Sequence, residues 1–198
     1  MKAKLVTPTI AIAALTILFY GGRESSHAQA ALKAKTTPGS PSRASDTRDI
    51  DIHKSAQKNK DNLSSRDAPG TLSGSYACAW AVNHVVKDAI GRDVSGDVPD
   101  GLLSTAVMYD TLVDQRGEEV DLEKAPAGSI VISPTRWVGG SRNTGHVGIL
   151  GQGTGNQRLI YSNSSRPALW KQNFTVGEWN KRYRTEKGLE VKIFRFAP

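Results

Sequence analysis

The stretch "SYACAWAVNHVVKDAIG", residues 75–91, holds the only cysteine of the chain and the pattern that decides its fold. Its apolar residues recur at helical spacing: Ala79, Val82, Val85, Val86 and Ala89. Ser73 and Ser75 precede them as candidate N-caps, and Gly91 is of a residue type that ends helices. The stretch therefore predicts a helix that ends at Gly91, with Cys78 in or just before its first turn.

The rest of the pattern predicts a second helix followed by strands. The helix is expected over about 101–115 and ends at Gly117, whereas short β-branched or alternating runs follow Pro126. The predicted strands are 128–133, 146–150, 158–163 and 189–196, and "GQGTGNQ" joins the second to the third as a hairpin. Helices followed by a run of neighbouring strands indicate an α+β domain.

The N-terminus has the pattern of a secretory signal peptide. Lys2 and Lys4 precede an apolar run over 5–20, and Ala28-Gln29-Ala30 gives the small-x-small pattern of a cleavage site. The run is short for a membrane span, so we expect cleavage, export to the periplasm or the extracellular cell wall, and no stable membrane insertion. An uncleaved anchor stays open as the alternative.

Residues 31–70 differ in composition from the remainder of the chain. They are rich in Ser, Lys, Asp, Ala and Pro and contain no aromatic residue, so they bury too little surface to offset chain entropy. We therefore expect a signal peptide at 1–30, a disordered tether at 31–70 and one folded domain at 71–198, with a monomer as the simplest assembly. A pro-segment that folds against the domain has no support in the sequence.

Charge is unevenly distributed over the predicted domain. Between Thr71 and Glu123 there are 3 basic and 10 acidic residues, a net charge of −7. Between Lys124 and Pro198 there are 12 basic and 3 acidic residues, a net charge of +9. The domain alone is then only about +2, which disfavours nucleic-acid binding. Two interpretations of the basic half stay open: it binds an anionic cell-envelope polymer, or it pairs with the acidic half.

Cys78 is the candidate nucleophile. In an exported protein a lone thiol forms an intermolecular bridge, packs as an inert residue or serves as a reactive group. A helix N-terminus lowers the pKa of a thiol, because its free N–H groups favour the thiolate. The position of Cys78 therefore favours the third interpretation.

A thiol nucleophile needs a base, and two histidines are available in the predicted domain. His84 is six residues along the same helix and faces away from Cys78, so it is expected to be structural or exposed to solvent. His146 opens a strand. An antiparallel pairing of 146–150 with 158–163 would place it opposite Ser162 or Asn163. Asn163 is the better acceptor to orient the ring, and Ser162 is the fallback on the opposite face.

Three segments together resemble the NlpC and CHAP branches of the papain-like superfamily. They are "CAWAVNHVV" at a helix start, "APAGSIVI" opening the sheet and "GHVGIL" on the next strand. The resemblance implies a papain-like α+β fold, with N-terminal helices packed on a small antiparallel β-sheet. Members of these branches are mostly bacterial enzymes that cut peptidoglycan. The family commonly has Asp where Ser129 stands here, a position we interpret as structural.

The resemblance implies Cys78 as nucleophile, His146 as base and Asn163 as the polar third residue. It also implies an oxyanion hole that uses the backbone N–H of Cys78, with Tyr76 as a candidate for the second donor. In the loop 133–145, Arg136 and Trp137 are candidate substrate contacts. No paired Cys and His spacing predicts a metal site, and no cofactor is expected.

The sequence therefore predicts a secreted cysteine peptidase or amidase that hydrolyses an amide bond in peptidoglycan. Two other classes stay open: a catalytically inactive wall-binding module, and an acyltransferase of the same fold. A housekeeping hydrolase and a toxin delivered to rival cells would share the chemistry.

Overall fold

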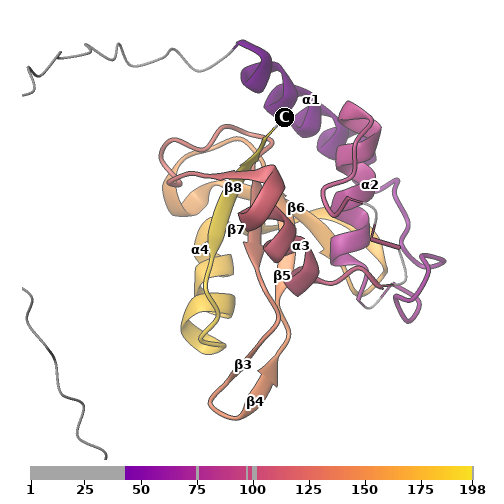
Figure 1. Ribbon diagram of the computed structural model, residues 1–198, viewed down its shortest axis with the longest axis vertical. Coiled ribbons are helices and arrows are strands. Elements are labelled where there is room, and N and C mark those ends of the chain that lie inside the picture. The colour runs from indigo at the N-terminus through magenta and orange to yellow at the C-terminus, as the bar shows by residue number, and fades with distance from the viewer. Residues whose placement is uncertain (1–42, 75, 97, 100–101, 198) are drawn as a thin grey trace, which may run out of the picture. The chain divides into compact units, whose positions relative to one another are not determined.

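A six-stranded antiparallel sheet forms the centre of the protein, with strand order β1-β8-β2-β5-β6-β7 (Figure 1). The computed structural model describes residues 43–74, 76–96, 98–99 and 102–197, so the predicted signal peptide at 1–30 lies outside the described residues. The strands are β1 (Gly117–Glu119), β2 (Ile130–Ser133), β5 (His146–Leu150), β6 (Leu159–Ser164), β7 (Leu169–Thr175) and β8 (Lys192–Phe196). A separate hairpin is formed by β3 (Arg136–Val138) and β4 (Ser141–Asn143).

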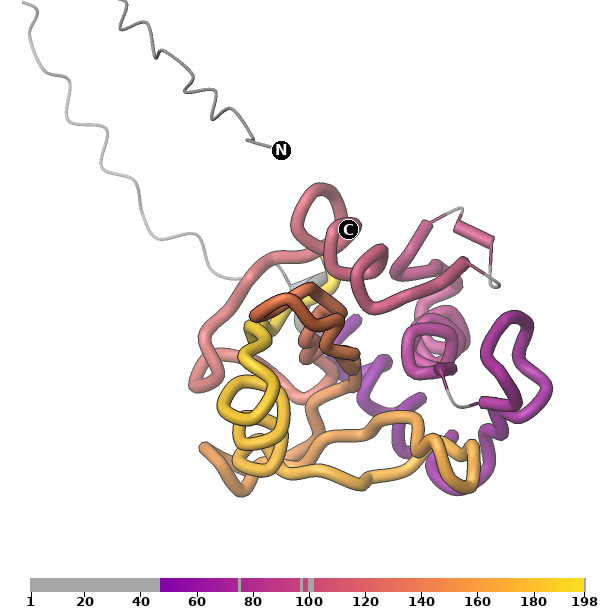
Figure 2. Tube along the Cα trace, turned by 90° about the horizontal axis from the view of Figure 1, so that it is seen from below, coloured from indigo at the N-terminus to yellow at the C-terminus, as the bar shows by residue number. Residues whose placement is uncertain are grey.

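Helical segments cover both faces of the sheet. They are α1 (Arg43–Asn59), α2 (Cys78–Ile90), α3 (Thr105–Thr111), η2 (Leu112–Arg116), η3 (Gly155–Gln157), α4 (Val176–Trp179) and η4 (Asn180–Glu186). Figure 2 shows α2 and the coil of α4 and η4 on opposite sides of the strands. The prediction of an α+β domain with helices on an antiparallel sheet is confirmed. Within the described ranges, every helix is too short or too polar to cross a membrane.

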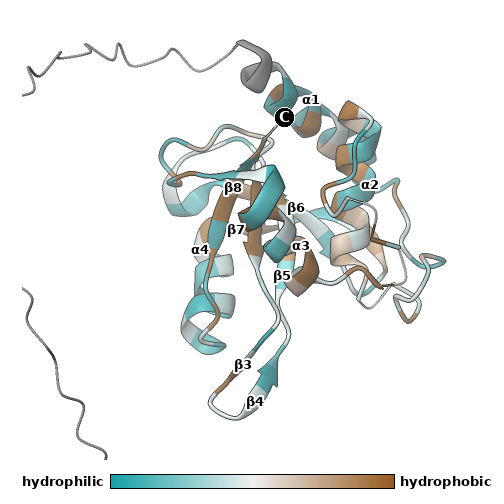
Figure 3. Cartoon of the chain, in the orientation of Figure 1, coloured by the Kyte–Doolittle hydropathy of each residue, from teal (hydrophilic) through white to brown (hydrophobic). Residues whose placement is uncertain are grey.

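Alternation along the strands builds two cores, one on each face. On one face, Ile132, Val147 and Ile149 pack with the apolar sides of α1 and α2. On the other face, Leu150 and Ile160 belong to a second cluster with Trp179 and Tyr183. Figure 3 shows hydrophobic residues on the central strands, whereas the projecting β3–β4 hairpin is mostly pale or hydrophilic.

The helix predicted from the opening stretch is α2, and it begins at Cys78. Its N-cap is Ala77, whose side chain makes no capping hydrogen bond, so the expected serine cap is wrong for Ser73. Ser73 instead has a φ of 55° in the turn before the helix, and Ser75 lies outside the described residues. Gly91 ends the helix in the left-handed conformation with φ 72°, as predicted.

The prediction of a disordered tether is wrong for residues 43–70. Residues 43–59 form α1, in which Ile52 and Ala56 are fully buried against the core that α2 covers. A polar composition predicts disorder, but several polar residues of α1 are bonded. Buried Asp49 pairs with Arg195 at 2.7 Å, and Ser55 Oγ donates to the carbonyl of Val85 at 2.8 Å. A narrow apolar stripe is thus enough to pack α1 on the core, because hydrogen bonds satisfy the polar residues beside the stripe.

The predicted strands are confirmed: 146–150 has the predicted bounds, and each of the other three differs by one to three residues at one or both ends. Strand β7 was not predicted. It pairs with β6 along its whole length, and the residues before α2 run beside its start through a bridge between Ser64 and Leu169. The second predicted helix is confirmed in part. It begins only at Thr105, where Ser104 caps it by accepting from the N–H of Val107 at 3.2 Å, and it continues as η2.

Candidate active site

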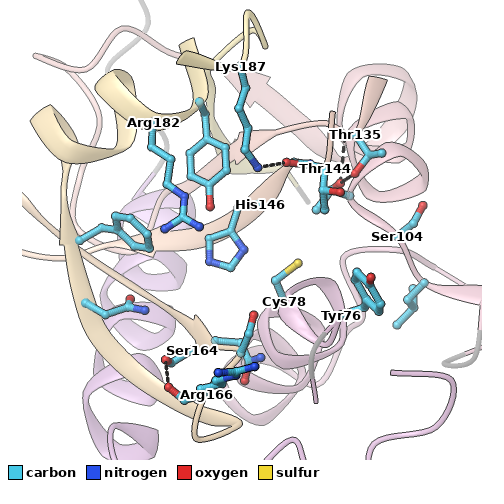
Figure 4. A pocket seen from close by; sticks show the side chains of 18 of the residues that line it. Tyr76, Cys78, Ser104, Thr135, Thr144, His146, Ser164, Arg166, Arg182 and Lys187 are labelled. Atoms are coloured by element: carbon cyan, nitrogen blue, oxygen red, sulfur yellow. Dashed lines mark hydrogen bonds between the residues drawn. The ribbon is translucent and has the colours of Figure 1, made fainter. Parts of the chain in front are cut away.

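A cavity of about 790 Å³ opens where the start of α2, the start of β5, the β6–β7 turn and η4 meet (Figure 4). It brings together two of the residues that the sequence singled out as reactive, Cys78 and His146. The cavity is also lined by Tyr76, Asn163, Asn173, Phe174, Tyr183 and the basic residues Arg142, Arg166, Arg182 and Lys187. The site is thus built from segments that are far apart in the chain.

Cys78 is the first residue of α2 and is partly buried. Burial raises the pKa of its thiol to about 11, against the lowering effect of the N–H groups of Ala79, Val147 and Cys78 itself. Because the backbone N–H of Val147 acts on the sulfur, the sulfur lies next to the residue that follows His146. The expected lowering of the thiol pKa by the helix N-terminus is therefore outweighed by burial, and the resting group is a neutral thiol.

The position of His146 depends on the glycine before it. A Cβ on Gly145 would lie 1.9 Å from the carbonyl oxygen of Ser133, so no larger residue fits there. The N–H of Gly145 donates to Thr135 Oγ1 at 2.9 Å, and Thr135 Oγ1 lies 2.9 Å from Thr105 Oγ1. The backbone is therefore fixed directly before β5, where His146 enters the cavity.

Aromatic rings hold the imidazole of His146. It stacks on Trp179 and Tyr183 with centroid distances of 5.2 and 5.7 Å, and Phe174 meets it edge-on at 5.9 Å. The indole N–H of Trp179 in turn donates to Ser133 Oγ at 3.0 Å. Burial lowers the pKa of His146 to about 3, with smaller effects of the charges on Arg182 and Lys187. The imidazole is therefore neutral over the physiological pH range.

A hydrogen-bonded chain defines which ring nitrogen is free. Ser162 Oγ donates to Asn173 Oδ1 at 2.7 Å, and His146 Nε2 lies 3.1 Å from the same hydroxyl oxygen. A hydroxyl has one proton to donate, so Ser162 accepts from an N–H on His146 Nε2. This arrangement leaves the lone pair of Nδ1 as the acceptor for the thiol proton. Figure 4 shows the Cys78 sulfur and this ring pointing into the same cavity.

The prediction that Asn163 orients His146 is wrong. Strand β5 pairs Gly148 with Ser162, a register shifted by one to two residues from the one expected, so Asn163 points to the α2 face. There its side chain accepts from Ser65 Oγ at 2.6 Å and donates to the carbonyl of Gly74 at 3.0 Å. Asn163 thus fixes the segment that leads into α2, and the fallback residue Ser162 is the one that meets His146.

The three predicted contacts with substrate have different outcomes. Tyr76 lines the cavity, on the side of Cys78 away from His146, and is 55% exposed (Figure 4). Arg136 does not line it: its guanidinium lies 3.8 Å from Asp110, 3.7 Å from Glu190 and over the ring of Tyr109. Trp137 is 73% exposed on the β3–β4 hairpin and also lies outside the cavity lining. Both hairpin residues therefore lie outside the cavity lining, and their contact with substrate stays a prediction.

His84 and Ser129 have the structural roles that were expected. His84 is exposed and stacks on Trp80 with a centroid distance of 5.2 Å. Ser129 is buried, and its hydroxyl donates to the carbonyl of Pro126 at 2.9 Å. In the part of the chain that the structure describes, no three His, Cys, Asp or Glu side chains gather as possible metal ligands.

The sequence did not single out Asn173 or two basic residues, one in η4 and one directly after it. Asn173 lies on β7, the strand that was not predicted, so its relation to Ser162 could not be seen. The signal that could have found it is the alternation in "LWKQNFT", residues 169–175, next to the predicted 158–163 strand. Arg182 and Lys187 were counted only as part of the basic half of the domain.

Comparison with known proteins identifies no relative. No family model matches the chain. No curated protein and no solved structure matches it either.

Proposed function

We propose that this protein is a papain-like thiol hydrolase, similar to the NlpC and CHAP enzymes, that cuts an amide bond in peptidoglycan. One observation carries the proposal: Cys78 and His146 face the same cavity, and the chain through Ser162 and Asn173 leaves Nδ1 of His146 free to accept a proton. A nucleophile, a base and a group that orients the base are the elements of thiol catalysis.

The chemistry follows from the neutral resting pair. His146 Nδ1 takes the thiol proton as Cys78 Sγ attacks the amide carbonyl and forms a C–S bond. The C–N bond then breaks as Nδ1–H gives its proton to the leaving amine. Water, deprotonated at Nδ1, attacks the thioester, and the thiol is restored when the carboxylic acid leaves.

The start of α2 provides donors for the oxyanion that forms during attack. The first N–H groups of a helix have no partner within the helix, and those of Cys78 and Ala79 are directed at the sulfur. A carbonyl carbon bonded to Sγ would place its oxygen among these groups. Tyr76, across the sulfur from His146, is a candidate for an additional donor from its hydroxyl.

Three features support peptidoglycan as the substrate. The N-terminal sequence predicts export, and three sequence segments resemble enzymes that act on this polymer. The cavity is open and lined by basic side chains, which suits peptides rich in carboxylates.

A second candidate is a wall-binding module without activity. The observation that favours it is the pair of pKa values in the site: a thiol raised to about 11 and an imidazole lowered to about 3 do not form a thiolate–imidazolium pair at rest. In that case the basic cavity binds peptides, and Cys78 is a packed residue.

Digestion of purified peptidoglycan by the intact chain tests the proposal. The products are identified by mass spectrometry, beside Cys78→Ser, His146→Ala and the matched control His84→Ala. We expect new amino and carboxyl ends from the parent and from His84→Ala but from neither site variant. An added amine acceptor that becomes acylated would indicate acyl transfer. Binding of peptidoglycan without cleavage by the folded parent would favour the wall-binding module.

A further inference from the structure

The cavity around Cys78 and His146 has charge of one sign. Arg142, Arg166, Arg182 and Lys187 line it, and none of the described residues that line it is Asp or Glu. Elsewhere in the described part of the basic half, several charges are neutralised across the fold: Lys192 pairs with Glu119, and Arg136 lies near Asp110. The cavity therefore gathers basic side chains that suit an anionic ligand.

Arg182 is the clearest of these free charges. Among the described residues no carboxylate lies within ion-pair distance of its guanidinium, which instead lies 5.7 Å from the ring centres of both Phe174 and Tyr183. Cation–π contacts of this kind hold a guanidinium in place without using up its hydrogen-bond donors. The aromatic rings that fix His146 thus also position Arg182.

Arg182 and Lys187 lie on the imidazole side of the cavity. Figure 4 shows both next to His146 and away from Tyr76, whereas Arg166 lies beyond Cys78 in the other direction. The charges of Arg182 and Lys187 also act on His146. Lys187 is anchored by a bond from Nζ to the carbonyl of Thr144 at 2.6 Å, and its ammonium has further protons to donate.

The position of these two charges relative to His146 indicates which fragment of the substrate they contact, because the two fragments lie on different sides of the site. His146 Nδ1 protonates the leaving amine, so the fragment that supplies this amine must lie against the imidazole. The acyl fragment, bonded to Sγ, extends the other way, toward Tyr76 and Arg166. Charges near the imidazole therefore face the amine fragment.

We propose that the substrate carries a carboxylate on the residue that supplies the scissile amine, and that Arg182, with Lys187 beside it, binds this carboxylate. The inference rests on the proposed function and names the part of the substrate that the site selects. A guanidinium binds a carboxylate through two parallel N–H···O bonds, which gives geometric selection as well as affinity.

The test uses the intact chain and synthetic stem and cross-bridge peptides of peptidoglycan, each in two forms. One form has a free carboxylate on the amine-side residue, and in the other this group is a primary amide. We expect kcat/KM to be about 10- to 100-fold higher for the free form, the range of a charge-assisted hydrogen bond. Arg182→Gln should reduce this ratio to about twofold, Arg182→Lys should restore part of it, and the matched control Arg166→Gln should retain it.

Equal kcat/KM values for the two forms in the parent, or a ratio that Arg182→Gln leaves unchanged, would overturn the inference. Loss of activity toward both forms alike would show a structural role for Arg182 and would also overturn it. The ratio, unlike the activity itself, is insensitive to general damage to the fold.

A binding measurement separates this inference from the proposed function. Calorimetric titration of Cys78→Ser with the amine fragments, free and amidated, requires no turnover. Tighter binding of the free form that is lost in Cys78→Ser with Arg182→Gln supports the inference even if the parent cuts no peptide. Equal binding of the two forms overturns it even if peptidoglycan is cut.

Discussion

Ser162 and Asn163 are adjacent on β6 but serve different regions of the molecule. Ser162 points to the face covered by α4 and η4, where it bonds His146 and Asn173. Asn163 points to the face covered by α2, where it bonds Ser65 and Gly74. The α4 and η4 face thus defines which ring nitrogen of His146 carries the proton, and the α2 face fixes the segment that leads to Cys78.

The position of a polar residue along a strand, odd or even, thus decides which face of the sheet it serves. Side chains alternate across a sheet, so a shift of one residue in register exchanges the two faces. The better hydrogen-bonding group, the carboxamide of Asn163, is used for the fold, and a hydroxyl is used at the site. Chemical suitability alone would assign the two residues the other way round.

The neighbours His146 and Val147 on β5 provide the sharpest test of this division. We expect His146→Ala to lower kcat/KM at least about a thousandfold, because no other described group can accept the thiol proton, while the protein remains folded. Val147→Ala should lower the free energy of unfolding by about 1 to 3 kcal/mol with little change in kcat. Peptide cleavage assays and urea denaturation measure the two effects. Similar kcat values for the two variants would break the division.

Asn163→Ala should have the next largest effect, on stability. It removes two buried hydrogen bonds and leaves Ser65 Oγ and the Gly74 carbonyl unsatisfied, so we expect a loss of about 2 to 4 kcal/mol in the free energy of unfolding. Urea denaturation followed by circular dichroism gives the value. If Asn163→Ala instead lowered kcat strongly at unchanged stability, Asn163 would belong to the site after all.

Ser162→Ala should lower kcat by about 10- to 100-fold, because Nε2 of His146 loses the group that fixes the N–H there. The free energy of unfolding should also fall, by about 1 to 2 kcal/mol, because the buried Nε2–H of His146 loses its partner. Asn173→Ala should cause a smaller loss of kcat in the same direction. Steady-state kinetics on one peptide substrate compares the three proteins. A normal kcat in Ser162→Ala would mean that the aromatic rings alone orient the imidazole.

The smallest expected effect is a dependence of stability on pH. The pKa of His146 is lowered to about 3 in the folded protein and is about 6.5 unfolded, so the unfolded chain takes up a proton first as pH falls. Stability from this group is therefore lost between about pH 6.5 and 3, amounting to about 1 kcal/mol between pH 7 and 5.5. His146→Gln should lack this pH-dependent loss of stability. Other titrating groups, including buried His53, contribute equally to both proteins and cancel when the parent and His146→Gln are compared. Equal pH dependence in both proteins would contradict a desolvated imidazole.

The sequence was informative where a local pattern carries the signal. Helical spacing located α2 with Cys78 at its start, and a glycine followed by a β-branched run located His146 at the start of β5. The positions of these two residues could be predicted from the order of helices and strands alone.

The sequence failed where a role depends on a partner distant in the chain. The register of β5 with β6 depends on the turn between them, and an error of one or two residues exchanged Ser162 for Asn163. Strand β7 has few purely apolar residues because it lies at an edge of the sheet, so Asn173 was overlooked with it. Helix α1 was missed because hydrogen bonds to residues such as Val85 and Arg195 satisfy its polar side chains.

Helix α1 also determines where recombinant versions of this protein can begin. A fragment cut at Thr71, where the composition changes, would lose Ile52 and Ala56 from the core and the carbonyl of Ala56 that accepts from the Trp170 indole at 3.0 Å. It would also remove Asp49, whose carboxylate pairs with Arg195. Such a fragment exposes an apolar surface over α2 and should aggregate on expression, whereas limited proteolysis of the intact protein should spare the chain from α1 onward.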